Sequence, residues 1–114
     1  IPIIYISLSQ KGISANDSER LLVKPIEDEV KTVEGIKEIR STAYSGGGNV
    51  LLEFDAGFNA DKAMQDVREK VDRAKGDLPD EANEPTVNEV NKAKNLGRKG
   101  KSLHFFYSIG VAYN

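Results

Sequence analysis

The stretch that decides the fold is IKEIRSTAYSGGGNVLLEF, residues 36–54. Its first half, IKEIRSTAY, reads as a strand, and its last half, NVLLEF, places alternate apolar residues on one face: Val50, Leu52 and Phe54. Between them, residues 45–48 (SGGG) supply the positive-φ freedom that a hairpin loop requires. A glycine run can also hold phosphate, but only before a helix N-terminus, and here a strand follows. The stretch therefore predicts a β-hairpin.

Upstream of this hairpin, residues 15–34 carry the apolar spacing of a helix. Apolar residues recur at intervals of four, four and three: Leu22, Ile26, Val30 and Val33. Ser14 is placed to cap the helix and Gly35 to end it. Pro25 lies inside the pattern and lacks the N–H that would bond to the Leu21 carbonyl, so we expect a kink or a helix in two segments.

Downstream of the hairpin, a second helix is expected from Asn59, its N-cap, to a point near Gly76. At 100° per residue, its apolar positions cluster on one side: Ala63, Met64, Val67, Val71 and Ala74. The other side carries a row of polar residues with Arg68 beside it, here named the polar stripe: Asp61, Gln65, Glu69 and Asp72. On its own, the stripe fits an ordinary solvated face stabilised by helical pairs such as Asp66–Lys70 and Glu69–Arg73.

The two ends of this region complete the pattern. Residues 2–9 (PIIYISLS) alternate as a strand, and residues 85–90 (PTVNEV) form a short last strand with Pro85 at its start. With right-handed crossovers, this order predicts an α+β, ferredoxin-like βαββαβ sandwich: a four-stranded antiparallel sheet with both helices on one face. The expected core is Ile4, Ile6, Leu22, Ile26, Val30, Val50, Leu52, Phe54, Val67 and Val71.

Charge divides the chain of 114 residues into two expected parts. Residues 1–91 carry 11 basic and 18 acidic side chains, a balance of −7, which disfavours nucleic acid as a partner. Residues 92–114 carry five basic side chains and no acid, and we interpret them as an atypical basic and aromatic tail of vector, frame-shift or truncation origin. We expect the tail to be disordered or to add as a strand to an exposed edge, and the main body to fold without it.

The sequence holds no recognisable catalytic or metal-binding pattern. Cysteine is absent, and the one histidine, His104, lies in the tail with no acid nearby. The consecutive acids of residues 27–29 point different ways on a helix and are interpreted as a solvated face. Tyr5 is the one aromatic placed on an outward face of a central strand, whereas sheet-based RNA binding needs several. We therefore expect no enzyme activity, no metal and no cofactor.

The ends of the chain and its hydropathy allow two further expectations. The chain opens at Ile1 with a strand already under way, so we expect it to be cut from a longer protein. No run of about 18 apolar residues is present, so no part of it is expected to span a membrane.

A longer series of residues resembles a known family. It runs over residues 18–75 and resumes over residues 78–91. Its matching features are Pro25-Ile26-Glu27, Glu34-Gly35-Ile36, Ile39-Arg40-Ser41, Gly57, Asp61, Ala63, Asp66-Val67-Arg68, Lys70 and Glu84-Pro85-Thr86-Val87. Residues 1–91 thereby resemble the first porter subdomain of resistance-nodulation-division (RND) efflux transporters of the hydrophobe/multidrug, acriflavin-resistance type, whereas residues 92–114 do not resemble that family's continuation.

The resemblance implies a proton-driven homotrimeric antiporter of the bacterial inner membrane, with this segment in the periplasm. Such transporters carry amphiphilic small molecules toward an outer-membrane channel, with a periplasmic adaptor in the complex. The helix that matches residues 59–76 lines a central pore with its two symmetry mates, which implies pore-facing positions for Asp61, Gln65, Glu69 and Asp72. The segment lacks the transmembrane helices of the family and is not expected to transport alone. Because three acidic stripes repel, we expect the isolated chain to be a monomer or a weak, differently arranged dimer.

Two other classes of function stay open from the residues. One is a free-standing ferredoxin-like module that binds a small ligand or dimerises through its sheet. The other is a small enzyme of acylphosphatase-like architecture, which needs an anion-cradling loop with an arginine; residues 9–14 (SQKGIS) offer Lys11 and a glycine but no arginine. A reading frame that continues into apolar segments of about 20 residues would favour the transporter.

Overall fold

The computed structural model describes residues 1–90, so the predictions made for residues 91–114 lie outside the described part of the chain. The elements follow in the order β1 (Ile3–Ser9), α1 (Ala15–Asp17), the π-helical η1 (Ser18–Val23), α2 (Lys24–Val30), β2 (Ile36–Tyr44), β3 (Gly47–Phe54), α3 (Ala60–Ala74), the 3₁₀ turn η2 (Lys75–Asp77) and β4 (Thr86–Glu89).

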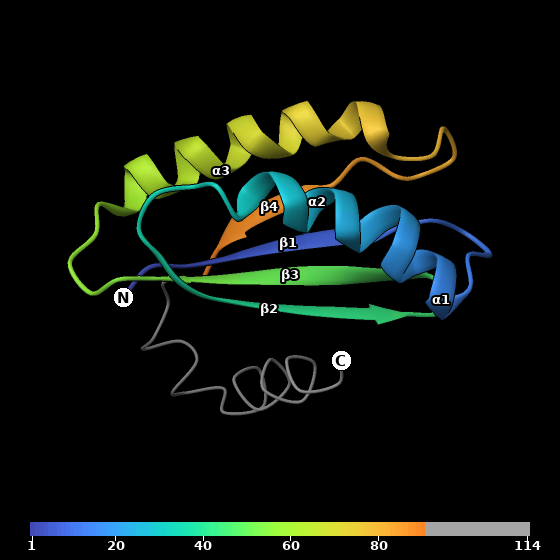
Figure 1. The fold of residues 1–114 in the computed structure, drawn as a ribbon, viewed down its shortest axis with the longest axis horizontal. Helices are drawn as coiled ribbons and strands as arrows, with labels where there is room; N and C mark the ends of the chain where they lie inside the picture. Colours follow the sequence, from blue (N-terminus) through green and yellow to red (C-terminus); the bar gives the residue numbers. More distant parts are fainter. Residues whose placement is uncertain (91–114) are drawn as a thin grey trace.

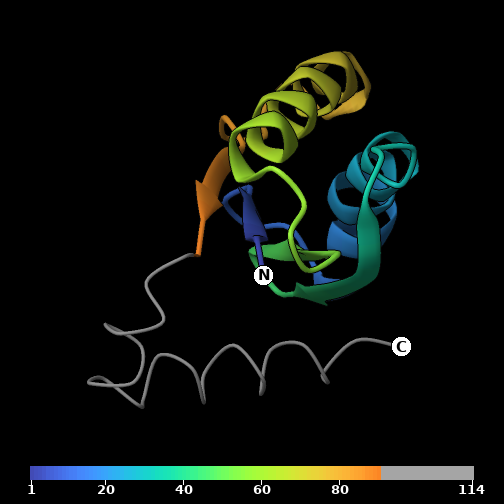
Figure 2. The same cartoon turned by 90° about the vertical axis from the view of Figure 1, so that its left-hand side faces the viewer.

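The four strands form one antiparallel sheet in the order β2-β3-β1-β4. The two long helical segments lie on the same side of this sheet, as Figure 1 and the end-on view of Figure 2 show. The predicted α+β, ferredoxin-like sandwich is confirmed.

The buried core is formed by alternate residues of the strands and by the apolar side of each helix. All ten residues expected in the core are at most 2% exposed. The register pairs Ile4 with Leu52 and Ile6 with Val50, so the apolar faces of β1 and β3 coincide beneath the helices. On the side of β1 that pairs with β4, the Val90 N–H donates to the Ile3 carbonyl at 2.7 Å, which brings the two ends of the described chain side by side.

The glycine run contributes less to the turn than expected. β2 and β3 pair up to Tyr44 and Gly47, so the connection is only Ser45-Gly46, with Gly46 at φ +98°. The next two glycines lie inside β3, where a Cβ on Gly47 would overlap the Leu8 carbonyl oxygen and one on Gly48 would overlap Val23. The prediction that residues 45–48 form the loop and that the strand starts at residue 49 was wrong, because the last two glycines serve close approach of neighbouring backbone and side chains.

The first helical region is continuous but irregular. Its π-helical turn ends just before Pro25, and the Lys24 N–H donates to the Glu19 carbonyl, five residues back. Pro25 then occupies the first turn of α2, where an N–H is least needed. The expected interruption at Pro25 is present in the form of a π turn. Gly35 does not end the helix, because α2 stops at Val30 and a turn intervenes.

Candidate functional site

Helix α3 is the element on which the sequence placed the candidate site. It begins at its predicted cap, where the Asn59 side chain accepts a hydrogen bond from the Lys62 N–H at 2.9 Å. Four residues on one side are buried, all of them small: Ala63, Val67, Val71 and Ala74. The helix therefore rests on the sheet and on α2 through a narrow apolar strip and leaves most of its circumference uncovered.

The polar stripe lies on the exposed side of α3. All four of its residues, Asp61, Gln65, Glu69 and Asp72, are exposed. At 100° per residue they fall within an arc of about 80°, whose centre lies about 160° from that of the buried strip. The structure thus brings the four residues together as one row that faces away from the rest of the described molecule.

The ion pairs of α3 differ from those expected from spacing. Within residues 1–90, Asp66 pairs with Lys62 at 3.1 Å and not with Lys70, and Glu69 and Arg73 form no ion pair. The hydrogen bond and negative charge of Asp66 raise the pKa of Lys62. At the other end of the helix, Lys75 contacts both Asp72 (3.0 Å) and Glu84.

These pairs leave most of the polar stripe unengaged. Within the described chain, the side chains of Asp61, Gln65 and Glu69 make no ion pair or hydrogen bond, and Asp72 is joined only to Lys75. Within residues 1–90, this row of polar groups is exposed, and local ion pairs do not explain why polar residues recur along it.

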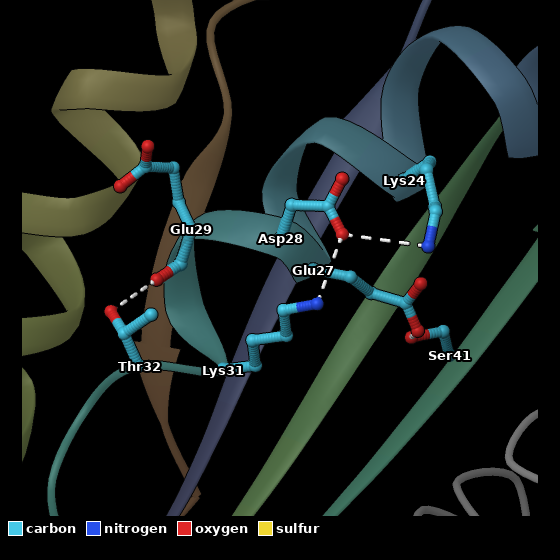
Figure 3. A network of polar contacts seen from close by, with 7 residues as sticks. All are labelled: Lys24, Glu27, Asp28, Glu29, Lys31, Thr32 and Ser41. Atoms are coloured by element: carbon cyan, nitrogen blue, oxygen red, sulfur yellow. Dashed lines mark hydrogen bonds and ion pairs between the residues drawn. The ribbon is translucent and has the colours of Figure 1, made fainter.

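The consecutive acids on α2 point three ways, as Figure 3 shows. Asp28 lies between Lys24 (3.4 Å) and Lys31 (3.5 Å), and Glu29 turns away from both. Glu27 instead accepts a hydrogen bond from the hydroxyl of Ser41, a buried residue of β2. The interpretation of all three as a solvated face was wrong for Glu27, which ties α2 to an outer strand.

The sheet face opposite the helices holds residues that sequence reasoning missed. Asn49 of β3 lies there between Ser7 and Thr42, is 2% exposed, and has no hydrogen-bond partner for its Nδ2 within residues 1–90. Tyr5 lies on the same face, as expected. Burial, and to a smaller extent the nearby Tyr44, raises the pKa of Tyr5, whereas a hydrogen bond with Ser7 lowers it. The alternation of β3 could have placed Asn49 on this face, but no sequence signal marked its burial.

Three other features bear on function. Residues 1–90 contain no group of three or more His, Cys, Asp or Glu side chains placed to hold a metal ion. In the same residues, no helix is both long enough and apolar enough to cross a membrane. A hollow of about 280 Å³ at the C-terminal end of α3 is lined by residues 75–76, 78–80 and 82–85, among them the ion pair of Lys75 and Glu84.

The fold and the stripe define a ferredoxin-like α+β segment whose exposed helix face is polar and whose described residues carry no metal cluster. A profile of the AcrB/AcrD/AcrF family matches residues 1–96, and the chain belongs to this family of RND transporters. Members of the family are transporters and not enzymes, which confirms the expectation that the chain is not an enzyme.

Individual relatives agree with this assignment. The chain is 28% identical over 87 residues to the swarming motility protein SwrC of Bacillus subtilis, covering 76% of the chain and 8% of SwrC. It is 28% identical over 91 residues to the multidrug resistance protein MdtC of Yersinia enterocolitica, covering 79% of the chain and 9% of that protein. The MdtC of Edwardsiella ictaluri is 30% identical over 78 residues, 68% of the chain and 8% of the relative. The chain thus spans less than one tenth of the length of these relatives.

Proposed function

We propose that this chain is a porter segment of a proton-driven efflux pump and that the polar stripe of α3 lines a water-filled central pore. The observation that carries the proposal is the stripe itself, four polar residues on one exposed arc with little local engagement. In a trimer, three such helices would meet around the symmetry axis, each with its apolar strip on its own sheet. The stripe needs only to be hydrophilic, and none of its residues acts as a catalyst.

The family relationship supports the wider setting of this proposal. The segment would lie in the periplasm, within a homotrimer anchored in the inner membrane of a bacterium. A periplasmic adaptor and an outer-membrane channel would complete the pathway, and amphiphilic small molecules would be the cargo. The printed name of the MdtC relatives, multidrug resistance protein, is consistent with cargo of this kind.

Cross-linking between subunits tests the pore assignment directly. In the intact transporter that carries this segment, cysteines at Gln65 should form intersubunit cross-links, because this residue lies in the middle of the exposed arc. Cysteines at Val67 should not, because Val67 is buried against its own sheet and serves as the matched control on the same helix. Dimer bands on non-reducing gels report the result. Cross-linking at Val67 without cross-linking at Gln65 would overturn the assignment.

The isolated chain offers a second test. Three acidic stripes repel when they face one another, so other parts of the transporter must hold them around the axis. We therefore expect the 114-residue chain to sediment as a monomer or as a weak dimer with another arrangement. A stable trimer that cross-links through Gln65 at low ionic strength would contradict the role given to those other parts.

A further inference from the structure

The ring of Phe58 lies against the backbone of Gly35, at a position that only glycine can occupy. Gly35 has φ +92°, and a Cβ built on it would overlap Cδ1 and Cε1 of the ring. The same ring stacks on Phe54, with centroids 5.6 Å apart and an interplanar angle of 28°. Because Phe54 is fully buried, Phe58 connects the core to the turn that follows α2.

One backbone hydrogen bond joins the same segments, the turn of residues 31–35 and the loop of residues 55–59, and a second one closes the loop on itself. The Asp55 N–H donates to the Gly35 carbonyl at 2.9 Å, and the Phe58 N–H donates to the Asp55 carbonyl at 3.0 Å. Glu34 and Lys62 attract each other across the gap, which contributes to the raised pKa of Lys62. Packing and a hydrogen bond therefore connect two segments that lie about twenty residues apart in sequence, and the charge of Glu34 reaches the first turn of α3.

The position of Phe58 gives these contacts a consequence for α3. Phe58 directly precedes Asn59, the cap of α3, whereas the fully buried side chains of the helix itself are only alanines and valines. Two larger apolar residues near the start of α3 are partly buried against the core: Phe58, just outside the helix, and Met64 within it. A hydrophobic residue immediately before the cap commonly fixes the angle at which the chain enters a helix.

We propose that Phe58 is a latch that couples the 31–35 turn to the start of α3, so that these two segments open and close as one unit. Without the ring, the turn and the loop would fluctuate independently and α3 would lose its fixed starting point. The proposal does not depend on the function proposed for the polar stripe.

Amide hydrogen exchange of the 114-residue chain tests the coupling. Three amides report on the unit through their own hydrogen bonds: Val33 (to the Val30 carbonyl), Asp55 (to Gly35) and Ala63 (to Asn59). In Phe58→Ala, all three should exchange at least about tenfold faster, while the Lys75 amide at the far end of α3 changes by less than about twofold. Faster exchange at Ala63 alone, or equal acceleration at all four amides, would overturn the latch. If Phe58→Ala does not fold, Phe58→Leu should show the same pattern at smaller amplitude.

A double-mutant cycle separates the ring contact from backbone strain. Gly35→Ala should lower the urea midpoint more than Gly12→Ala, because Gly12 has a similar φ (+80°) but no atom within 4 Å of its added Cβ. In the Phe58→Ala background, the shift caused by Gly35→Ala should fall to that of Gly12→Ala, since the ring is gone. Strictly additive shifts for Gly35→Ala and Phe58→Ala would show that the two residues are not coupled.

Discussion

The two helical regions above the sheet differ in almost every physical respect. The first, residues 15–30, consists of three consecutive segments of two helical types (α, π and α) and contains a proline, yet its buried residues include leucine, isoleucine and valine. The second, α3, is a regular helix of 15 residues with a good cap, yet it buries only alanine and valine. The first region thus contributes larger side chains to the core but is an irregular helix. Helix α3 is regular but contributes only small side chains to the core.

This difference indicates how the two regions are stabilised. We infer that tertiary packing contributes more to the irregular region than to α3, because the buried side chains of the irregular region are larger. A regular helix that buries only a narrow apolar strip can also present an evenly spaced row of exposed polar groups, which an irregular helix cannot. Substitutions that test core volume, proline tolerance and capping should therefore have unequal effects in the two regions.

The largest expected difference concerns core volume. Leu22→Ala in the first region should reduce the free energy of unfolding by about 2–5 kcal/mol, and Leu52→Ala in the strand beneath should cost a similar amount. Val67→Ala in α3 should cost only about 1–2 kcal/mol, because it removes two methyl groups. Urea denaturation measures each value. Equal losses at Leu22 and Val67 would contradict the comparison, and a loss below about 0.5 kcal/mol at Leu52 would mean that the strand faces are misassigned.

A change at a proline position should affect the stability of the first region less than that of α3, the reverse of the order expected for core truncation. Glu69→Pro, on the exposed face of α3, should cost about 3 kcal/mol, because the helix interior has no π turn to accommodate it. Pro25→Ala should change stability by less than about 1 kcal/mol, since the native proline already lies in the first turn of α2. Thermal and urea unfolding report both, and Glu69→Ala controls for loss of the side chain. A Pro25→Ala gain of several kcal/mol would show that the π turn is strained.

The caps should distinguish the regions by a smaller amount. Asn59→Ala should cost about 1 kcal/mol, because it removes the acceptor for the Lys62 N–H at the start of a long regular helix. Ser14→Ala removes the acceptor for the Asp17 N–H at 3.1 Å, but α1 is only three residues long and leads into the π turn, so we expect less than half that loss. Asn59→Asp keeps an acceptor and serves as the control. A greater loss at Ser14 would reverse the comparison.

The smallest effect concerns Tyr5, which lies under neither helical region. Its pKa is raised above the ordinary value of 10.0, chiefly by burial, so the folded state holds the phenol proton more firmly than the unfolded state. The contribution of Tyr5 is therefore fully present below pH 10 and is lost as pH rises from the unfolded toward the folded pKa. Tyr5→Phe should flatten the loss of stability above pH 10, measured by urea midpoints from pH 8 to 11. An identical pH profile in the variant would contradict the burial of this hydroxyl.

Much of the fold could be read from local patterns because those patterns are repeated and mutually consistent. The alternation in β1 and β3 and the helical spacing of apolar residues in α3 each specify a buried face, and both N-caps, Ser14 and Asn59, are short polar residues of the kind that favours that position. The row of exposed residues on α3 followed from the same periodicity. The pore-facing orientation that we propose for this row does not follow from the periodicity, because it depends on molecules outside this chain.

The parts that could not be predicted depend on distant neighbours. A glycine looks the same in sequence whether it turns the chain or admits Val23, as Gly48 does. The hydrogen bond between Glu27 and Ser41 joins residues fourteen positions apart on elements whose separation no periodicity specifies. Asp66 has lysines four residues away on both sides, and side-chain placement in the folded helix selects Lys62. A π turn is likewise one of several ways to accommodate Pro25.

The hydrogen bond from the Val90 N–H to the Ile3 carbonyl holds the two ends of this fold side by side. A fold with adjacent ends can be transferred as one unit between longer polypeptides. The chain enters through β1 and leaves through the antiparallel β4, so the two connections lie one strand spacing apart, about 5 Å. A host protein can accept such a unit at a single surface position without separating its own flanking segments. The same proximity would let a short linker join the two connections, with new termini opened at the Ser45-Gly46 turn. Gene duplication and grafting could therefore copy this unit whole, with its helix face already in place.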